Sequence, residues 1–162
     1  MDVSREQVLE WLHDVPDPEI PVLSITDLGI VRDVTIDESE SVSVALAPTY
    51  SGCPATEVIE KSVVDALHDH GVHNVSIERR LSPPWTTDWI SDEGREKLRE
   101  YGIAPPAAGG GKRALLDAGR VIACPRCGSE QTALVSEFGS TACKASYRCT
   151  ACLEPFEYFK CI

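Results

Sequence analysis

The sequence predicts an α+β protein in two parts: a small helix-covered sheet domain with the order α-β-β-α-β, then a small β domain organised by cysteines. Two observations support this prediction. Along the first half of the chain, apolar residues recur at helical spacing in some stretches and alternate with polar residues in others. In the second half, six of the seven cysteines gather within residues 124–161.

The first predicted element is a short helix. Ser4 is the expected N-cap, and Gln7 three residues later completes a capping box. An apolar stripe that includes Val8 and Leu12 follows at helical spacing. The next stretch, DVPDPEIPV, contains three prolines and is therefore expected to be irregular.

Strands and a longer helix complete the first domain. Residues 32–37 (RDVTID) and 41–48 (SVSVALAP) alternate β-branched with polar side chains, which predicts a hairpin. A second helix is expected to begin at Pro54, a favoured first helical residue, and to end at Gly71. Residues 74–81 (NVSIERRL) predict a third strand.

The domain boundaries follow from composition. A polar helix over residues 91–102 is expected to close the first domain, which we predict to span residues 1–103. The stretch APPAAGGGKR (104–113) has the prolines and glycines of a linker. The second domain, residues 114–162, should hold three short strands: TALVSEF, ACKASYRC and EPFEYFKCI.

Two C-x-x-C pairs in the second domain predict a metal site. Cys124 and Cys127 form one pair, Cys149 and Cys152 form the other, and 21 residues separate the pairs. Two such turns supply four soft ligands in the tetrahedral arrangement that zinc prefers in structural sites. Zinc binding worth about 10–16 kcal/mol would fold a module too small to be stable alone, so we expect a zinc ribbon. The same four thiolates would also hold a single iron, which would make the site an electron carrier.

Cys143 and Cys161 belong to neither pair. If residue 149 opposes residue 155 in a hairpin, the register places Cys143 opposite Cys161, with Cβ atoms about 5 Å apart. One interpretation is that both are small buried side chains. The other is a second thiol pair that binds iron or an iron–sulfur cluster, or cycles through a disulfide.

Cys53 is the single cysteine of the first domain. It directly precedes Pro54, where the dipole and free N–H groups of the predicted helix would stabilise a thiolate. It is either an ordinary core residue or a reactive thiol. Asp17 and Glu19, in the proline-flanked loop, could approach it only through tertiary folding. Trp85 and Trp89 form an aromatic patch after the third strand, for packing or as a partner surface.

Charge and hydropathy restrict the partners. The net charge is −11, and residues 1–113 carry all of it, with 21 acidic and 10 basic side chains. Such a chain repels phosphate backbones, so we expect no nucleic-acid partner. The acidic excess either keeps the protein in solution or orients it on a basic protein. There is no long apolar run and no apolar signal core, so we expect no membrane segment and a cytoplasmic location.

Motifs in the first domain resemble a known family. The segments DPEI (17–20), DLG (27–29) and the turn from Thr49 to Pro54 are similar to the diagnostic positions of the iron–sulfur cluster assembly domain of SufT-type proteins. The resemblance covers residues 4–81. It implies that Cys53 is the thiol of cluster transfer, with Asp17, Glu19 and Thr49 nearby.

The second domain narrows the resemblance. CPRCGSEQTALVSEFGSTACKASYRC followed by EPFEYFKCI is similar to the PaaD family, the accessory subunits of the phenylacetyl-CoA epoxidase system of aromatic degradation. All six C-terminal cysteines match that family. The resemblance implies partners among the other subunits of the system, an oxygenase with a di-iron site or a reductase with a flavin and an iron–sulfur centre. The sequence leaves open whether the chain also forms a homodimer.

We therefore expect a non-catalytic accessory subunit of phenylacetate catabolism. It would assemble or insert an iron–sulfur or iron centre in a client, with the reductase as the preferred client and structural zinc in the ribbon. The alternative is an electron-transfer component with iron in the four-cysteine site. The sequence lacks the two Glu-x-x-His motifs of a di-iron site, since this pattern occurs once, from Glu10 to His13, and it has no glycine-rich dinucleotide fingerprint and no nucleophile–base pattern.

Overall fold

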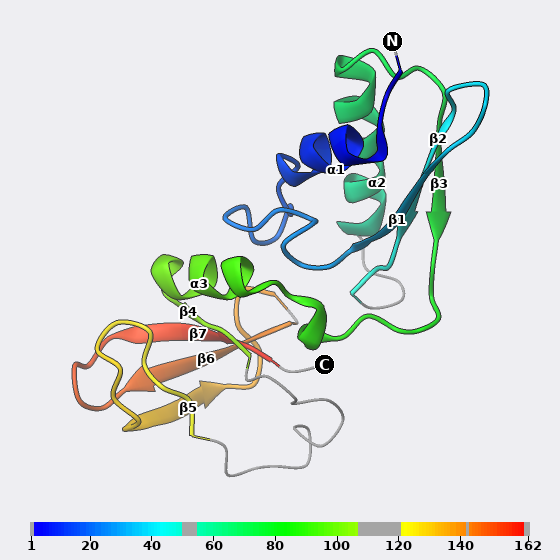
Figure 1. Ribbon diagram of the computed structural model, residues 1–162. Helices are drawn as coiled ribbons and strands as arrows, with labels where there is room; N and C mark the ends of the chain where they lie inside the picture. Colours follow the sequence, from blue (N-terminus) through cyan, green and yellow to red (C-terminus); the bar gives the residue numbers. More distant parts are fainter. Residues whose placement is uncertain (1, 50–54, 107–120, 142, 161–162) are drawn as a thin grey trace. The chain divides into compact units, whose positions relative to one another are not determined.

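The computed structural model describes residues 2–49, 55–106, 121–141 and 143–160 (Figure 1). The chain divides into two compact units, residues 1–85 and 86–162. The structure thus places the boundary at residue 85, whereas the sequence predicts it at residue 103. Each unit is described by itself below.

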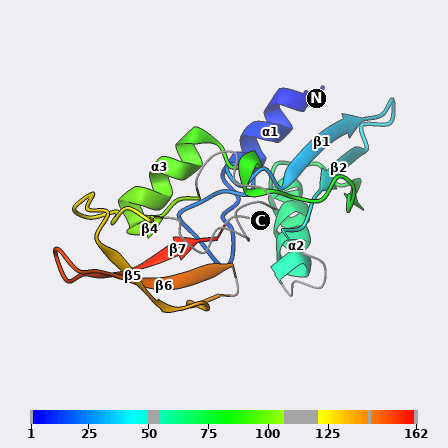
Figure 2. The same ribbon diagram turned by 90° about the horizontal axis from the view of Figure 1, so that it is seen from below.

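The first unit is a three-stranded sheet with two helices. Its elements are α1 (Arg5–His13), β1 (Val31–Ile36), β2 (Val42–Leu46), α2 (Ala55–Asp69) and β3 (Val75–Arg79). The order α-β-β-α-β confirms the predicted fold class. The sheet order is β1-β2-β3, with β1 and β2 antiparallel and β2 and β3 parallel. Both helices lie on one side of this sheet (Figures 1 and 2).

The helix boundaries follow the predicted capping chemistry. The Ser4 hydroxyl accepts a hydrogen bond from the Gln7 amide at 3.2 Å, and the Gln7 side chain accepts one from the Ser4 amide at 2.9 Å. This confirms the predicted capping box of α1. At the end of α2, the Gly71 amide donates to the His68 carbonyl at 2.9 Å, so the predicted stop is also confirmed. The predicted start at Pro54 lies outside the described residues.

The core of the first unit lies between the sheet and the helices. Val34 of β1 is paired with Val44 of β2, and both are buried. On the helices, Leu12 of α1 and Val63 and Leu67 of α2 are completely buried. Each such side chain stabilises the fold by about 1.5–3 kcal/mol, which explains why the two amphipathic helices and the alternating strands fold as one unit.

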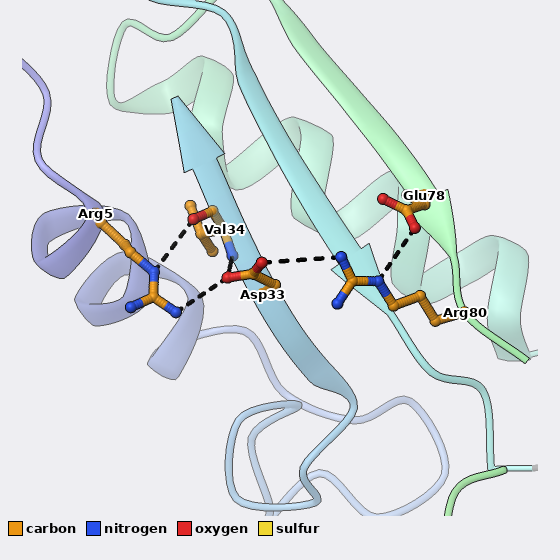
Figure 3. A network of polar contacts seen from close by, with 5 residues as sticks. All are labelled: Arg5, Asp33, Val34, Glu78 and Arg80. Atoms are coloured by element: carbon orange, nitrogen blue, oxygen red, sulfur yellow. Dashed lines mark hydrogen bonds and ion pairs between the residues drawn. The ribbon is translucent and has the colours of Figure 1, made fainter. Parts of the chain in front are cut away.

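Charged side chains connect α1 to the sheet (Figure 3). Arg5 donates to the Val34 carbonyl at 3.2 Å and to the Asp33 carboxylate at 3.0 Å. The other oxygen of Asp33 lies 3.8 Å from Arg80, which also donates to Glu78 at 3.1 Å. Since these pairs are largely exposed, each contributes at most about 1 kcal/mol. Their effect is to place charge beside the outer strands β1 and β3.

Trp85 anchors the irregular loop before β1. Its indole N–H donates to the Leu28 carbonyl at 2.7 Å, and the side chain is only 4% exposed. The packing interpretation of Trp85 is therefore confirmed.

We expect Trp85→Phe to lower the free energy of unfolding by about 1–2 kcal/mol. The phenyl ring is smaller than the indole, and the buried Leu28 carbonyl would lose its donor. Urea unfolding of the full chain measures this change, and an unchanged midpoint would show that the hydrogen bond contributes nothing.

The second unit begins with a short 3-10 helix (Thr87–Trp89) and α3 (Asp92–Tyr101). α3 has Ser91 as its N-cap and Gly102 at its C-terminus, as the polar pattern predicts. It belongs to this unit because the strand that directly follows it, β4 (Ile103–Ala104), pairs in parallel with β7. The predicted linker 104–113 therefore begins on a strand residue; its residues 107–113 lie outside the described residues.

The remaining strands of the second unit are β5 (Thr132–Ser136), β6 (Lys144–Cys149) and β7 (Pro155–Phe159), which lie within the three predicted segments. They form a sheet with the order β4-β7-β6-β5, and Figure 2 shows β5, β6 and β7 side by side. The predicted hairpin register is wrong by one residue. Arg148 pairs with Pro155, and the Lys160 amide donates to the Cys143 carbonyl at 3.0 Å, so Cys143 faces Lys160.

None of the helices in the described ranges has the length and apolar content that crossing a membrane requires.

Candidate functional site

The four paired cysteines of the second unit converge. The Sγ atoms of Cys124 and Cys152 are 3.8 Å apart, those of Cys127 and Cys149 are 3.6 Å apart, and all four lie within 4.8 Å of one another. A Zn–S bond of about 2.3 Å in tetrahedral geometry separates the sulfurs by about 3.8 Å. A disulfide would require about 2.05 Å. The arrangement therefore fits one four-coordinate metal ion and no disulfide.

Each cysteine pair lies in a tight turn, which we call a knuckle. In the first knuckle, the Gly128 amide donates to the Cys124 carbonyl at 2.9 Å. In the second, the Cys149 amide donates to the Glu154 carbonyl at 3.0 Å, which closes the hairpin between β6 and β7. The residue after each pair has positive φ: +74° at Gly128 and +67° at Leu153. The two knuckles thus share one backbone plan, a left-handed residue directly after the second cysteine. This residue is glycine in the first knuckle and leucine in the second.

Hydrogen bonds join the first knuckle to the sheet. The Thr150 amide and hydroxyl both donate to the Gln131 carbonyl, at 2.8 and 2.9 Å. The Thr132 hydroxyl donates to the Ile122 carbonyl at 2.6 Å. These bonds hold residues 122–131, which carry the first two sulfurs, against β5 and the second knuckle.

The sulfurs differ in acidity. The Cys152 amide donates to the Cys149 sulfur at 3.4 Å, and this bond is the main reason that the pKa of Cys149 falls to about 6. At Cys152 the Glu154 amide lowers the pKa, but desolvation and the neighbouring thiols raise it, and the net result is a pKa of about 12. Sulfurs this close cannot all carry negative charge alone, so a dication is the natural partner of the cluster.

The core around the cysteines is small. It consists of Ala104, Ile122, Cys124, Cys149, Phe156 and Tyr158, with Tyr147 packed against it. The Tyr147 ring stacks on Phe156 and meets Tyr158 edge-on, with centroids 5.8 Å apart in both cases. A core of this size gives little stability alone, so we expect a metal bound by the four cysteines to contribute to the fold of the ribbon.

The positive φ at Leu153 gives a matched pair of variants. A left-handed conformation costs an L-residue about 1–2 kcal/mol, and glycine avoids most of that cost. Because folding and metal binding are linked, we expect Gly128→Leu to weaken zinc affinity about tenfold. Leu153→Gly should strengthen it by up to about fivefold. Competition with a chelator measures both affinities; changes of the same sign would contradict the shared backbone plan.

The sequence did not indicate one contact at the first knuckle. A Cβ added at Gly102 would lie 3.3 Å from a guanidinium nitrogen of Arg126, and φ at Gly102 is +92°. Arg126 therefore covers the C-terminus of α3, where the helix dipole favours a cation. This contact joins the first knuckle to α3. No sequence pattern predicts a contact between residues so far apart in the chain.

The predicted transfer site of the first unit is described only in part, because Cys53 lies outside the described residues. Asp17 is 6% exposed, and its carboxylate accepts hydrogen bonds from the amides of Glu19 at 2.9 Å and Ile20 at 2.8 Å. Glu19 and Thr49 are half-buried. The structure thus gives Asp17 a role in shaping its loop, while the proximity of these residues to Cys53 stays a prediction.

The predicted second thiol pair is likewise described in part. Cys143 is buried, and its sulfur lies 3.0 Å from the Thr141 hydroxyl. Cys161 lies outside the described residues. The register no longer places the two residues opposite each other, so the argument from register for their meeting is lost.

Sequence comparisons match the two units separately. The profile of the "Iron-sulfur cluster assembly protein" family matches residues 5–77, and that of the "PaaD zinc beta ribbon domain" matches residues 108–160. A protein of Escherichia coli K12, named as a subunit of a putative 1,2-phenylacetyl-CoA epoxidase, is 53% identical, over 96% of this chain and 92% of that protein. An Fe-S protein maturation auxiliary factor of Porphyromonas gingivalis is 32% identical, over 59% of this chain and 90% of that protein.

Solved structures match part of the chain. A domain of unknown function, DUF59, from Bacillus anthracis has a TM-score of 0.55 and 28% identity, and covers 58% of this chain and 90% of that one. A conserved hypothetical protein from Thermotoga maritima has a TM-score of 0.52 and 37% identity, and covers 60% of this chain and 95% of that one. Both similarities agree with an α+β fold for the first unit.

Proposed function

The chain belongs to the PaaD family, in which an iron–sulfur cluster assembly domain precedes a zinc ribbon, and from this we propose that it is a maturation factor of the phenylacetyl-CoA epoxidase system. In this role it catalyses no step of ring epoxidation. It assembles or inserts an iron–sulfur or iron centre in a client protein, and the reductase is the preferred client.

One observation carries the proposal: both domains occur in one chain that aligns along 96% of its length with a protein named as an epoxidase subunit. Relatives of the first domain alone are named Fe-S protein maturation auxiliary factors. The first domain would supply the maturation chemistry, and the ribbon would direct it to one system.

The proposed chemistry is ligand exchange at Cys53. A thiolate there, next to the start of α2, would hold iron or a cluster weakly. A thiol of the client loses its proton as it binds the iron, and Cys53 takes up a proton as it leaves. The exchange needs no oxidant or reductant, so the centre passes on with its electrons unchanged.

The ribbon metal would have a structural role. Cys124, Cys127, Cys149 and Cys152 would hold zinc, which supplies no redox chemistry and shapes the surface that meets the client. Four thiolates in this geometry fit a single iron equally well, and iron would favour electron transfer instead.

Metal analysis separates these two roles. We expect the protein, purified without oxygen, to be colourless and to contain one zinc per chain in the four-cysteine site. Metal analysis and an absorption spectrum measure this. A coloured, redox-active protein with iron in place of zinc would favour the electron-transfer role.

The test of the maturation role is the state of the client. The reductase would be purified from cells with and without this chain, and its iron, sulfide and flavin contents measured. We expect iron and sulfide to fall severalfold without the chain while flavin is retained. A fully loaded reductase and oxygenase from cells that lack the chain would overturn the proposal.

A further inference from the structure

Within the described residues, the outer strand β5 of the ribbon sheet has one unpaired edge, which we call the open edge. In the order β4-β7-β6-β5, β5 pairs with β6 on one side, and no strand of the described ranges pairs with its other side (Figure 1). An open edge presents backbone N–H and C=O groups that can accept a further strand.

Large apolar side chains are exposed on and beside this edge. Leu134 is 51% exposed, Val135 67% and Phe138 66%. The pairing with β6 is irregular between Leu134 and Ser136, so Val135 is an extra residue in the strand. Such bulges redirect side chains, and here the inserted residue is the most exposed of the three.

The other outer strands of the described ranges carry charges or are short and buried, and β5 differs from them. Charged residues occur within β1 and β3, and Arg5 donates a hydrogen bond to the backbone of β1. β4 is short and buried. β5 reads TALVS, with neither a charge nor a proline. Charges and prolines are common means of preventing strand addition. β5 has neither, so the bulge at Val135 is the one such feature within it.

We propose that β5 is a docking edge, to which a partner protein adds an extended segment as a fifth strand of the ribbon sheet. Glu130 and Glu137 are exposed and lie just beyond the two ends of β5. The segment that fits this edge is therefore apolar in its middle and carries a basic side chain at each end. Backbone hydrogen bonds would give affinity, and the two carboxylates would set the position.

A second copy of this chain fits the edge less well. The first unit has 16 acidic and 5 basic residues, so it carries the entire net charge of −11, and two copies would repel each other. A five-residue strand also offers less than the roughly 800 Å² per partner of a stable interface. A brief contact with a different protein suits an edge of this size. Only the identity of that protein, another component of the epoxidase system, rests on the proposed function.

Peptide binding to the zinc-loaded full chain tests the proposal. The probe is a fluorescent eight-residue peptide of alternating valine and threonine with lysine at both ends, and the matched peptide carries glutamate at both ends. Fluorescence anisotropy gives each Kd. We expect the lysine-ended peptide to bind at least about tenfold more tightly, since each end of the edge contributes one charge pair.

Two valines provide a matched comparison of variants. Val135→Lys places a charge on the edge. It should raise the Kd of the lysine-ended peptide about tenfold or more. Val121→Lys changes a residue of the same unit, outside β5, that is 61% exposed, and should leave the Kd within about twofold. Zinc content and circular dichroism verify that both variants are folded. Equal effects of the two variants would overturn the proposal.

Charge reversal gives the opposite signature. In the double variant Glu130→Lys, Glu137→Lys, the preference should switch to the glutamate-ended peptide. If neither peptide binds, or if sedimentation finds a dimer that Val135→Lys dissociates, the edge does not serve a partner protein and the proposal fails. A bound peptide together with a client that loads normally without this chain would refute the proposed function and leave the docking edge standing.

Discussion

Cys149→Ser is expected to abolish zinc binding and to unfold the ribbon. Cys149 is completely buried, its sulfur lies 3.6 Å from that of Cys127, and it accepts the Cys152 amide. Serine keeps the volume but loses the soft ligand, so most of the roughly 10–16 kcal/mol of zinc binding is lost. The small aromatic core cannot replace that contribution. Zinc content should fall from one per chain to near zero.

The structure offers a matched control for this variant. Cys143 is buried in the same sheet region but lies outside the four-sulfur cluster, so Cys143→Ser should retain one zinc. In Cys149→Ser the amide signals of residues 121–160 should collapse in an NMR spectrum, while those of the first unit persist because that unit has its own core. A folded ribbon that holds one zinc without the Cys149 sulfur would contradict the four-thiolate site.

Cys53→Ser is expected to leave folding and zinc content unchanged but to reduce cluster delivery to the client at least tenfold. The role proposed for Cys53 is ligand exchange, and a hydroxyl is a poor ligand for iron. The measurement is the iron and sulfide content of the reductase from cells that express the variant as the sole copy. The ribbon does not involve Cys53, so its zinc serves as the internal control.

Cys143→Ser in the same assay tests the second thiol pair. If only Cys53 exchanges ligands, this variant should load the client normally. If the iron and sulfide content of the reductase fell as far as with Cys53→Ser, Cys143 would also take part in the transfer. Full loading by Cys53→Ser would refute the role of that thiol.

Local chemistry explains why much of the fold could be predicted from the sequence. The capping box at Ser4, the alternation in β1 and β2 and the turn at Gly71 each depend on residues close together in the chain. The four-cysteine cluster was predictable for the same reason, because a C-x-x-C turn fixes two ligands locally and two turns complete one site.

Longer-range features were not predictable. The pattern predicts α3 as a helix, but it cannot assign the helix to a unit, since the assignment depends on the two-residue strand β4. The register of β6 and β7 depends on the length of the second knuckle. The hairpin closes between Cys149 and Glu154, one residue earlier than expected, and a shift of one residue changes which side chains face each other.

The candidate site shows the same division. The four cysteines that could hold a metal follow from spacing, whereas the contact of Arg126 with Gly102 and the left-handed backbone of Leu153 appear only in the folded chain. The open edge of β5 also required the sheet order, because a sequence of alternating residues does not tell which strand is outermost.

The most direct test of the maturation role is transfer between purified proteins. This chain, with zinc in its ribbon and loaded with radioactive iron and sulfide, would be mixed with reductase that lacks its cluster, in the presence of a chelator that traps free iron. We expect the label to move to the reductase and restore its electron transfer, while the zinc stays behind. Label that goes only to the chelator, or a reductase that loads equally well from free iron and sulfide, would contradict the maturation role.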